Sequence, residues 1–396
     1  MKRIAILLLV SILAISGMIS CASPSAEKSY KIGALTSQTG KYAGLGLQTL
    51  EGMQVIVEDI NEKGGINGIP LELVPCDDKS STTGVTLGAK KLIEVEKVDV
   101  ILHGSTTALA QSTMPVADEG KTPALLLSGT ALFDDQLGKW CFRPMGSEED
   151  YVISFFQYLN EDLGITRVAA LMENSGFGQG FEFFMTGIAS EYNIDVVATE
   201  YFDPTATDLT LQMTDIKNSS AQALVVWGSG PAGALAIKQA RDMGVNLPIT
   251  ASFAQGSADM VKAFGEYYEM SPSLVVPASK TDIWQELPED DPDKAMCRDF
   301  ASLFLEKTDP PQPAEFYSVV GAQMMLFVVD ALQRAQTDPT NVEKARSEIR
   351  DALEATENLN LLTAVYTLSP DDHYGGVMQK LVLITFKDGE KILVPR

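Results

Sequence analysis

The chain has 396 residues, 45% of them hydrophobic, and its 30 Lys and Arg face 53 Asp and Glu, which gives a formal net charge of −23. Such an acidic surface repels nucleic acid and anionic lipid, and the sequence has no basic patch, so the composition excludes a nucleic-acid-binding protein. The two histidines and four cysteines match no metal-binding spacing, and we expect neither a metal site nor a cofactor.

The N-terminal segment 1–21 has the features of an export signal. Lys2 and Arg3 precede an apolar core, and small residues lead to Cys21. The run Met18-Ile19-Ser20-Cys21 resembles a bacterial lipobox, although methionine stands where leucine is usual. The resemblance implies an extracytoplasmic protein that is acylated at Cys21 and contacts the membrane only through this anchor. The alternative is an ordinary cleaved signal with a chance cysteine.

After the signal, short apolar runs alternate with amphipathic helical patterns. The expected strands of the first half are 30–35, 69–78, 98–104 and 123–129. The expected helices are 46–63, 84–96 and the stretch that opens at "STTALAQSTMPVADEG". This alternation predicts parallel sheets that are covered by helices on both faces.

The pattern restarts after "CFRPMGSEEDYVISFFQYLNEDLG", which crosses into a new helix. The expected strands of the second half are 167–173, 195–202, 223–227, 248–252 and 273–277. The chain is then helical over about 291–307, 314–336 and 340–355. It closes with the hairpin "KLVLITFKDGEKILV", where Asp388-Gly389 is a hairpin-turn signal.

We therefore expect an α/β protein with two doubly wound parallel-sheet lobes. Returns of the chain predict three crossovers, near 143–148, 278–284 and 360–376, which form a hinge around a ligand cleft. The expected lobes are discontinuous and comprise 29–145 plus 281–362, and 146–280 plus 363–396. The alternative, two independent domains, fits poorly because no flexible linker lies near the middle.

Five segments carry a likeness to a known family: "IGALTSQTGKYAGLG", "EDINEKGGINGIPLELVPCDD", "GFGQGF", "VVWGSGPAGALAIKQARDMG" and "LSPDDHYG". They resemble the leucine/isoleucine/valine-binding proteins, which are type I periplasmic substrate-binding proteins of ABC importers. The second segment is the most specific, because a helix end, a glycine-rich turn, a strand and paired aspartates occur together. The resemblance covers nearly the whole mature chain. It implies the type I periplasmic binding protein fold and a monomer that delivers its ligand to an ABC permease.

The turn Gly228-Ser229-Gly230-Pro231-Ala232-Gly233 matches the dinucleotide-binding pattern between a strand and a helix. Such a site needs an acidic residue at the end of the next strand, which here ends "PITASFAQ" without one. Nicotinamide cofactors are also not expected in an exported protein. We expect these glycines to let the backbone turn tightly at the edge of the cleft.

In the first lobe, the candidate ligand residues follow strand ends. Ser105 and Thr106 follow a strand and open a helix, where backbone N–H groups and hydroxyls can bind an anion. The alternative is a plain helix cap, because Ser and Thr are preferred there. The family resemblance implies that Ser105 and Thr130 supply hydroxyls and N–H groups to an amino acid. It implies that Ser128 supplies its backbone carbonyl.

In the second lobe, the sequence departs from the amino-acid-binding pattern of the family. Phe177 stands where the family has a tyrosine, and Phe253 lies at or beside the position of an acid that faces the ligand ammonium. Ser229 lies where relatives carry an aromatic residue, and Leu45 in the first lobe replaces a tyrosine of some relatives. These changes predict a more apolar pocket. The alternative for Phe177 and Phe253 is ordinary core packing.

An ammonium group that faces Phe253 loses its charge partner, at a cost of roughly 3–5 kcal/mol. We therefore expect the ligand to be a small apolar or aromatic carboxylate. The rival is a branched-chain amino acid whose ammonium meets another acid: Asp78, Glu173 or Asp203.

The function implied by the resemblance is that of a substrate-binding lipoprotein of an ABC importer. A sensory ligand-binding protein that reports to a membrane receptor is the alternative. An enzyme is disfavoured because no nucleophile–base pair stands out.

Overall fold

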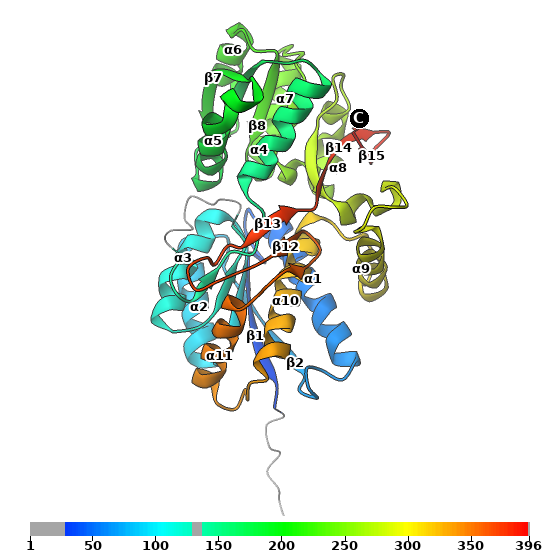
Figure 1. Cartoon of the computed structure of the whole chain (residues 1–396). Coiled ribbons are helices and arrows are strands. Elements are labelled where there is room, and N and C mark those ends of the chain that lie inside the picture. The colour runs from blue at the N-terminus through cyan, green and yellow to red at the C-terminus, as the bar shows by residue number, and fades with distance from the viewer. Residues whose placement is uncertain (1–27, 129–136, 395–396) are drawn as a thin grey trace, which may run out of the picture.

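Two parallel sheets form the framework of the protein, one in each of two lobes (Figure 1). The computed structural model describes residues 28–128 and 137–394. The first sheet has the strand order β2-β1-β3-β4-β5 and the second β7-β6-β8-β9. All neighbours within these two sheets are parallel.

The first lobe is built from an N-terminal half and from three helices that come late in the chain. Its strands are β1 (Tyr30–Thr36), β2 (Leu71–Asp77), β3 (Val100–Gly104), β4 (Ala124–Leu126) and β5 (Cys141–Phe142). Its helices are α1 (Ala43–Glu62), α2 (Thr82–Lys90), the π-helix η1 (Lys91–Glu96), α3 (Thr107–Glu119), α9 (Lys294–Lys307), α10 (Phe316–Ala335) and α11 (Val342–Glu354).

The second lobe follows the same alternation. Its strands are β6 (Arg167–Glu173), β7 (Asp195–Phe202), β8 (Ala223–Trp227) and β9 (Ile249–Ala251). Its helical segments are α4 (Glu148–Gln157), η3 (Tyr158–Asp162), α5 (Gly176–Ile188), η4 (Ala189–Tyr192), α6 (Thr210–Asn218), α7 (Gly230–Asp242), η5 (Phe253–Gly256) and α8 (Ala258–Tyr268).

Two small antiparallel sheets complete the structure. One has the order β10-β14-β15, with β10 (Val276–Ser279), β14 (Leu381–Lys387) and β15 (Glu390–Leu393). The other contains β11 (Leu359–Asn360), β12 (Ala364–Tyr366) and β13 (Gly376–Gln379) and lies near the junction of the lobes (Figure 1). A 3-10 helix, η6 (Lys280–Glu286), follows β10.

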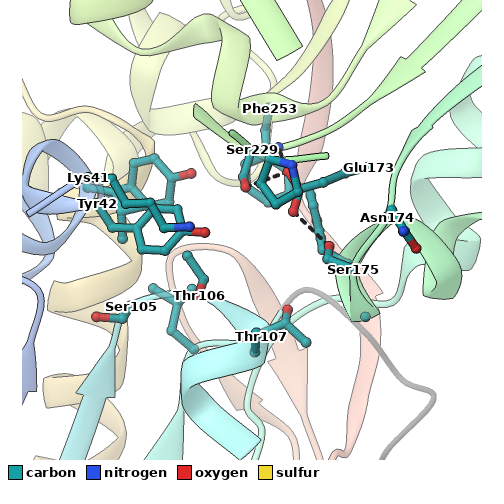
Figure 2. A pocket seen from close by; sticks show the side chains of 17 residues that line it. Lys41, Tyr42, Ser105, Thr106, Thr107, Glu173, Asn174, Ser175, Ser229 and Phe253 are labelled. Carbon is teal, nitrogen blue, oxygen red and sulfur yellow. Dashed lines mark hydrogen bonds between the residues drawn. The ribbon is translucent and has the colours of Figure 1, made fainter. Parts of the chain in front are cut away.

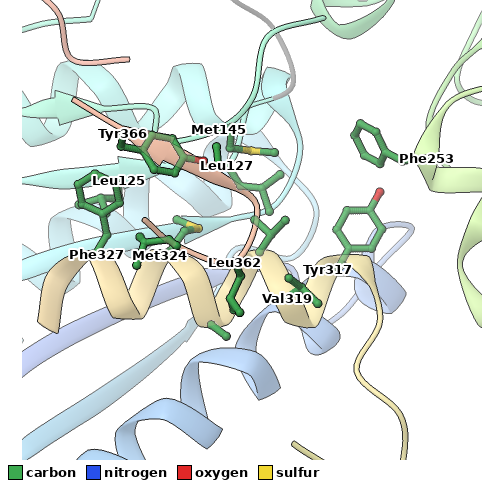
Figure 3. Packing of buried hydrophobic residues seen from close by; sticks show 14 of the residues in the cluster. Leu125, Leu127, Met145, Phe253, Tyr317, Val319, Met324, Phe327, Leu362 and Tyr366 are labelled. Atoms are coloured by element: carbon green, nitrogen blue, oxygen red, sulfur yellow. The ribbon is translucent and has the colours of Figure 1, made fainter. Parts of the chain in front are cut away.

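Burial explains why the parallel strands form where they do. Every residue of β3 and β8 is buried, as expected for strands with helices on both faces. One apolar cluster belongs to each lobe, and a third and largest cluster runs through both lobes. This third cluster includes Tyr317 on α10 and Phe253 of the second lobe, which face each other in Figure 3. The apolar core therefore continues from one lobe into the other.

Helix α10 is long, apolar and largely buried, and glycines let it pack closely on α1. A Cβ atom on Gly52 would lie 2.0 Å from the Ser318 carbonyl oxygen, and one on Gly321 would lie 2.0 Å from that of Thr49. Within the described residues, α10 alone is long and apolar enough to cross a membrane, but 83% of its most apolar window is buried. It is a core helix, and its first turn carries Tyr317.

Three segments connect the lobes, at 143–147, at 280–293 and at Lys380 between β13 and β14 (Figure 1). Asp293 ties the last two together, because its carboxylate oxygens lie 2.9 Å from Lys280 Nζ and 2.7 Å from Lys380 Nζ. The first crossing coincides with the one expected, the second begins within the expected 278–284 but runs beyond it, and the third comes later than 360–376. That stretch packs on the first lobe, where Tyr366 contacts Phe327 with ring centroids 5.3 Å apart. The residue limits of the lobes stay a prediction.

Other differences from the expected elements have local causes. The strand expected at 273–277 is shifted to β10, which pairs antiparallel with β14. The short strand β5 was not expected, and the helix expected at 84–96 divides into α2 and η1. The closing hairpin is confirmed, with Asp388 and Gly389 both at positive φ. Cys76, Cys141 and Cys297 are free thiols.

Candidate functional site

A cavity of about 340 Å³ lies between the two lobes, within the usual range for small-molecule sites. It opens beyond the C-terminal ends of β1, β3, β6 and β8, where ligands bind in open α/β sheets. Its lining consists of Lys41, Tyr42, Leu45, Ser105, Thr106, Thr107, Ala108, Leu127, Glu173, Asn174, Ser175, Gly176, Phe177, Pro204, Ser229, Phe253 and Tyr317. Figure 2 shows Thr106 and Thr107 facing Glu173, Ser175 and Ser229 across it.

The first-lobe wall of the cavity is the N-terminus of α3. Thr106 is the N-cap residue of α3, but its side chain accepts no capping hydrogen bond. Its Oγ1 atom is buried and has no hydrogen-bond partner among the described residues. A buried hydroxyl at the positive end of a helix is suited to an anionic ligand group. Thr106 thus occupies the N-cap position without making a capping hydrogen bond, and ligand binding by its hydroxyl stays a prediction.

Ser105 has a different role from Thr106, because its hydroxyl is engaged inside the first lobe. Ser105 Oγ donates to Asp78 Oδ2 at 2.5 Å and accepts from the Ser37 N–H at 2.9 Å. The Asp78 carboxylate also accepts from Ser37 Oγ at 2.6 Å and from the Ser80 N–H at 2.7 Å. This network fixes the loop that carries Thr106.

His103, at the end of β3, lies against the same network. Its Nε2 atom lies 3.9 Å from Asp78 Oδ2. Burial lowers the pKa of His103 to about 4, and the neighbouring Asp78 acts in the opposite direction. The imidazole is therefore neutral at pH 7 and adds no positive charge to this wall.

The second-lobe wall is centred on Glu173, the last residue of β6. Its side chain lines the cavity although the residue is only 3% exposed. Glu173 Oε1 accepts from Ser175 Oγ at 2.7 Å, and Oε2 accepts from both the N–H and the Oγ of Ser229, each at 2.7 Å (Figure 2). These donors fix the carboxylate at the cavity surface.

Aromatic rings line the cavity together with this carboxylate. Phe177 and Phe253 have ring centroids 5.7 Å apart, and Phe253 stacks on Phe316 of the first lobe at 4.2 Å. The ring centroids of Tyr317 and Phe253 are 6.3 Å apart. Burial raises the pKa of Tyr317, and the negative charge of Glu173 raises it further. Phe253 thus belongs both to the cavity wall and to the contact between lobes.

The structure places most of the predicted ligand residues at this cavity. Leu45, Ser105, Thr106, Phe177, Ser229 and Phe253 all line it. Ser128 lies outside the lining, where its Oγ donates to Thr107 Oγ1 at 3.5 Å and its carbonyl oxygen accepts from Arg143 at 3.4 Å. Thr130 and Cys21 lie outside the described residues. That the lining residues bind a ligand stays a prediction.

Of the three acids that the sequence left open, the structure brings one to the cavity. Glu173 lines it, whereas Asp78 is fully buried within the Ser37–Ser105 network. Asp203 is exposed and accepts from the Thr205 N–H at 2.7 Å. The second lobe therefore offers a carboxylate after all, at a different strand end from Phe253.

Sequence reasoning missed other lining residues. Lys41 and Tyr42 lie in the first segment of the family likeness, and the Lys41 ammonium sits 4.7 Å from the centre of the Tyr42 ring. Their place in the loop between β1 and α1 is a strand-end signal that could have identified them. Tyr317 enters from the first turn of α10, for which the strand-end rule gives no signal.

The glycine-rich turn after β8 places Ser229 against Glu173 in the second-lobe wall. Gly230 has a φ of +62°, so the backbone can turn into α7 directly after Ser229. The N–H of Ser229 points to Glu173 Oε2. A Cβ on Gly233 would lie 2.5 Å from Gln255 Nε2. The pattern thus has a structural explanation in the position of Glu173.

The "SPDDHYGG" segment forms a turn. Asp372 Oδ1 accepts from the N–H groups of Tyr374 and Gly375 at 2.9 and 3.0 Å, and the His373 ring stacks on Phe142 at 4.2 Å. Among the described residues, no group of three His, Cys, Asp or Glu side chains is placed to hold a metal ion.

Comparison with known proteins gives a match over nearly the whole chain. Residues 29–391 match the sequence model of a family described as periplasmic binding protein. An amino acid binding protein from Pseudomonas aeruginosa is 24% identical over 215 residues, which are 54% of this chain and 58% of the relative. The Leu/Ile/Val-binding protein BraC3 from Rhizobium johnstonii is 24% identical over 231 residues, 57% of this chain and 62% of the relative. The matches thus span about three fifths of these relatives.

Solved structures share the fold. An extracellular ligand-binding receptor from Rhodopseudomonas palustris HaA2 has a TM-score of 0.83 at 21% identity, over 92% of this chain and 99% of that chain. The branched-chain amino acid substrate-binding protein LivJ from Streptococcus pneumoniae, solved with isoleucine, has a TM-score of 0.77 at 21% identity, over 92% and 98%. The expected two-lobed α/β fold is confirmed.

Proposed function

The chain belongs to the periplasmic binding protein family, of the Leu/Ile/Val-binding type, and from this premise we propose that it is the substrate-binding component of an ABC importer. It captures a small carboxylate, amino acids included, in the cavity between its lobes. Closure of the lobes removes the ligand from water, and the closed form, a monomer, docks on a permease. Members of this family bind substrates and do not act as enzymes. The proposed cycle includes no covalent chemistry.

One observation carries this proposal. Thr106 Oγ1 is buried, lines the cavity and has no partner among the described residues. A buried hydroxyl without a partner costs free energy, which a bound acceptor recovers. The backbone N–H groups of the first turn of α3 lie next to this hydroxyl. A ligand carboxylate is therefore the acceptor that fits this site best.

We also propose that the protein works outside the cytoplasm and is anchored by acylation of Cys21. The family supports the location, and the lipobox-like run supports the anchor. In a bacterial host, the full chain should fractionate with membranes, and a Cys21→Ala variant should be released from them. Membrane retention of Cys21→Ala would contradict the anchor.

Thermal unfolding of the purified protein with a ligand panel tests the binding function. The panel contains leucine, its des-amino analogue 4-methylpentanoate, phenylalanine and a simple aromatic acid. A ligand at about 100 times its Kd should add about 2.7 kcal/mol to the free energy of unfolding. If every member leaves the unfolding temperature unchanged at millimolar concentration, the proposed capture of a small carboxylate is contradicted.

A further inference from the structure

We propose that Glu173 binds the ammonium group of the ligand, so that the protein selects α-amino acids over their des-amino analogues. This inference rests on the proposed function and specifies its substrate class. It also replaces our expectation of an apolar or aromatic carboxylate, which depended on the loss of the acid at Phe253. The structure supplies an acid from β6 instead.

The hydrogen bonds of Glu173 leave it able to accept from a ligand. Oε2 is occupied by both donors of Ser229, while Oε1 accepts from Ser175 Oγ alone among the described residues. A carboxylate oxygen accepts more than one hydrogen bond. Oε1 can therefore receive an N–H of an ammonium without the loss of an existing contact.

The surroundings of Glu173 make a cation the fitting partner. Glu173 is only 3% exposed, and it lines the cavity together with the rings of Phe177, Phe253 and Tyr317. A carboxylate held in such a place needs a charged partner, and aromatic faces also attract ammonium groups. The other charged residue of the lining, Lys41, is exposed and sits over the Tyr42 ring.

The two ends of an α-amino acid then match the two walls. The carboxylate fits the α3 N-terminus and the Thr106 hydroxyl, and the ammonium fits Glu173. The apolar side chain is left to Leu45, Leu127 and the aromatic rings. In this arrangement Phe253 does not face an unpaired ammonium group, because Glu173 supplies the negative charge.

Isothermal titration of leucine and of 4-methylpentanoate into the wild type and a Glu173→Gln variant tests this inference. Wild type should bind leucine at least about 100-fold more tightly than 4-methylpentanoate, because a buried charge without its partner costs several kcal/mol. Glu173→Gln should weaken leucine binding by about 100-fold or more and change the Kd of 4-methylpentanoate by less than about threefold. The exposed Glu191→Gln, with the same change of charge, should leave both values unchanged.

A second variant covers the case in which Glu173→Gln does not fold. Glu173→Asp keeps the charge but withdraws it by one methylene, and it should lose leucine affinity by about tenfold with discrimination retained. Equal affinity of wild type for the two ligands, or equal discrimination in wild type and Glu173→Gln, would overturn the inference and leave the proposed function intact. If neither ligand nor any other member of the panel binds the wild type, the proposed function itself fails.

Discussion

The two walls of the cavity differ in what they offer a ligand. The first-lobe wall presents a helix N-terminus and the Thr106 hydroxyl, while His103 behind it is neutral. The second-lobe wall presents the Glu173 carboxylate within aromatic rings. One wall favours negative charge and the other positive charge, so the cavity is electrically polarised across the cleft. Similar strand–helix units thus present groups of opposite electrostatic character to the cleft, through residues at or just after their strand ends.

The largest expected effect concerns the aromatic part of the second wall. Phe253 is 6% exposed and stacks on Phe316 of the opposite lobe. Phe253→Ala should lower the free energy of unfolding by about 3–5 kcal/mol, as is usual for a deleted buried phenylalanine. Urea denaturation measures this change. Phe183→Ala, at a 61% exposed position, should cost less than about 0.5 kcal/mol. Equal costs would contradict the role of Phe253 in joining the lobes.

The free energy of unfolding should depend on pH through His103, which lies behind the first-lobe wall. Because the pKa of His103 is lowered to about 4 in the folded protein, the unfolded chain binds a proton near pH 6.5 that the folded protein does not. This contribution is complete above pH 6.5 and is lost as the pH falls toward 4, by about 3 kcal/mol. Denaturant unfolding across this range should therefore show a steeper loss in wild type than in His103→Gln.

Other buried groups do not obscure that comparison. Burial raises the pKa of Asp99 and of Asp282 to about 7, which acts in the opposite direction. Both are present in wild type and His103→Gln, so the difference between the two curves isolates His103. Parallel curves would show that His103 is not held neutral beneath the first wall.

The next largest effect is the loss of carboxylate binding when the Thr106 hydroxyl is removed. Thr106→Val keeps the shape of the side chain and should weaken carboxylate binding by about 1.5–3 kcal/mol, the contribution of a hydrogen bond to a charged group. The stability of the ligand-free protein should not fall, because Oγ1 has no partner to lose among the described residues. Titration calorimetry and unfolding measure the two quantities.

Thr113 provides a matched control on the same helix. Its Oγ1 is also buried without a partner among the described residues, but it does not line the cavity. Thr113→Val should bind ligand as the wild type does. Equal losses in the two variants would show that the α3 N-terminus is not the anion-binding wall.

The smallest expected effect concerns the closure of the two lobes and not the opposite charge preference of the two cavity walls. Glu315, at the start of α10, accepts from the Ala258 N–H at the start of α8 at 3.0 Å and from Gln48 Nε2 at 3.2 Å. Glu315→Gln removes a charge at a helix N-terminus of the other lobe, worth about 1 kcal/mol or fivefold in Kd. The loss should be equal for leucine and 4-methylpentanoate, with the exposed Glu306→Gln as control. A selective loss for leucine would show that Glu173 is not the group that distinguishes the two ligands.

Local patterns in the sequence were sufficient for most of the fold. The limits of β6, β7 and β8 were predicted correctly, because each is an apolar run between clear turn signals. The shift of β10 was missed because its partner, β14, lies about a hundred residues later in the chain. Pairing at that distance leaves no local periodicity to detect.

The site was predictable where strand ends define it. The strand-end rule identified Ser105 and Thr106, which line the cavity together with Phe177 and Ser229, the two residues that the family resemblance indicated. It could not choose among Asp78, Glu173 and Asp203, because the direction of each carboxylate depends on hydrogen bonds from distant loops. Glu173 is turned to the cavity by Ser229, 56 residues later in the chain.

A crystal structure of the protein with leucine tests the polarised cavity most directly. We expect the leucine carboxylate within hydrogen-bond distance of Thr106 Oγ1 and the N–H groups of α3, and the ammonium within hydrogen-bond distance of Glu173 Oε1. Leucine bound with its ammonium away from Glu173, or with its carboxylate away from the α3 N-terminus, would contradict the polarised cavity.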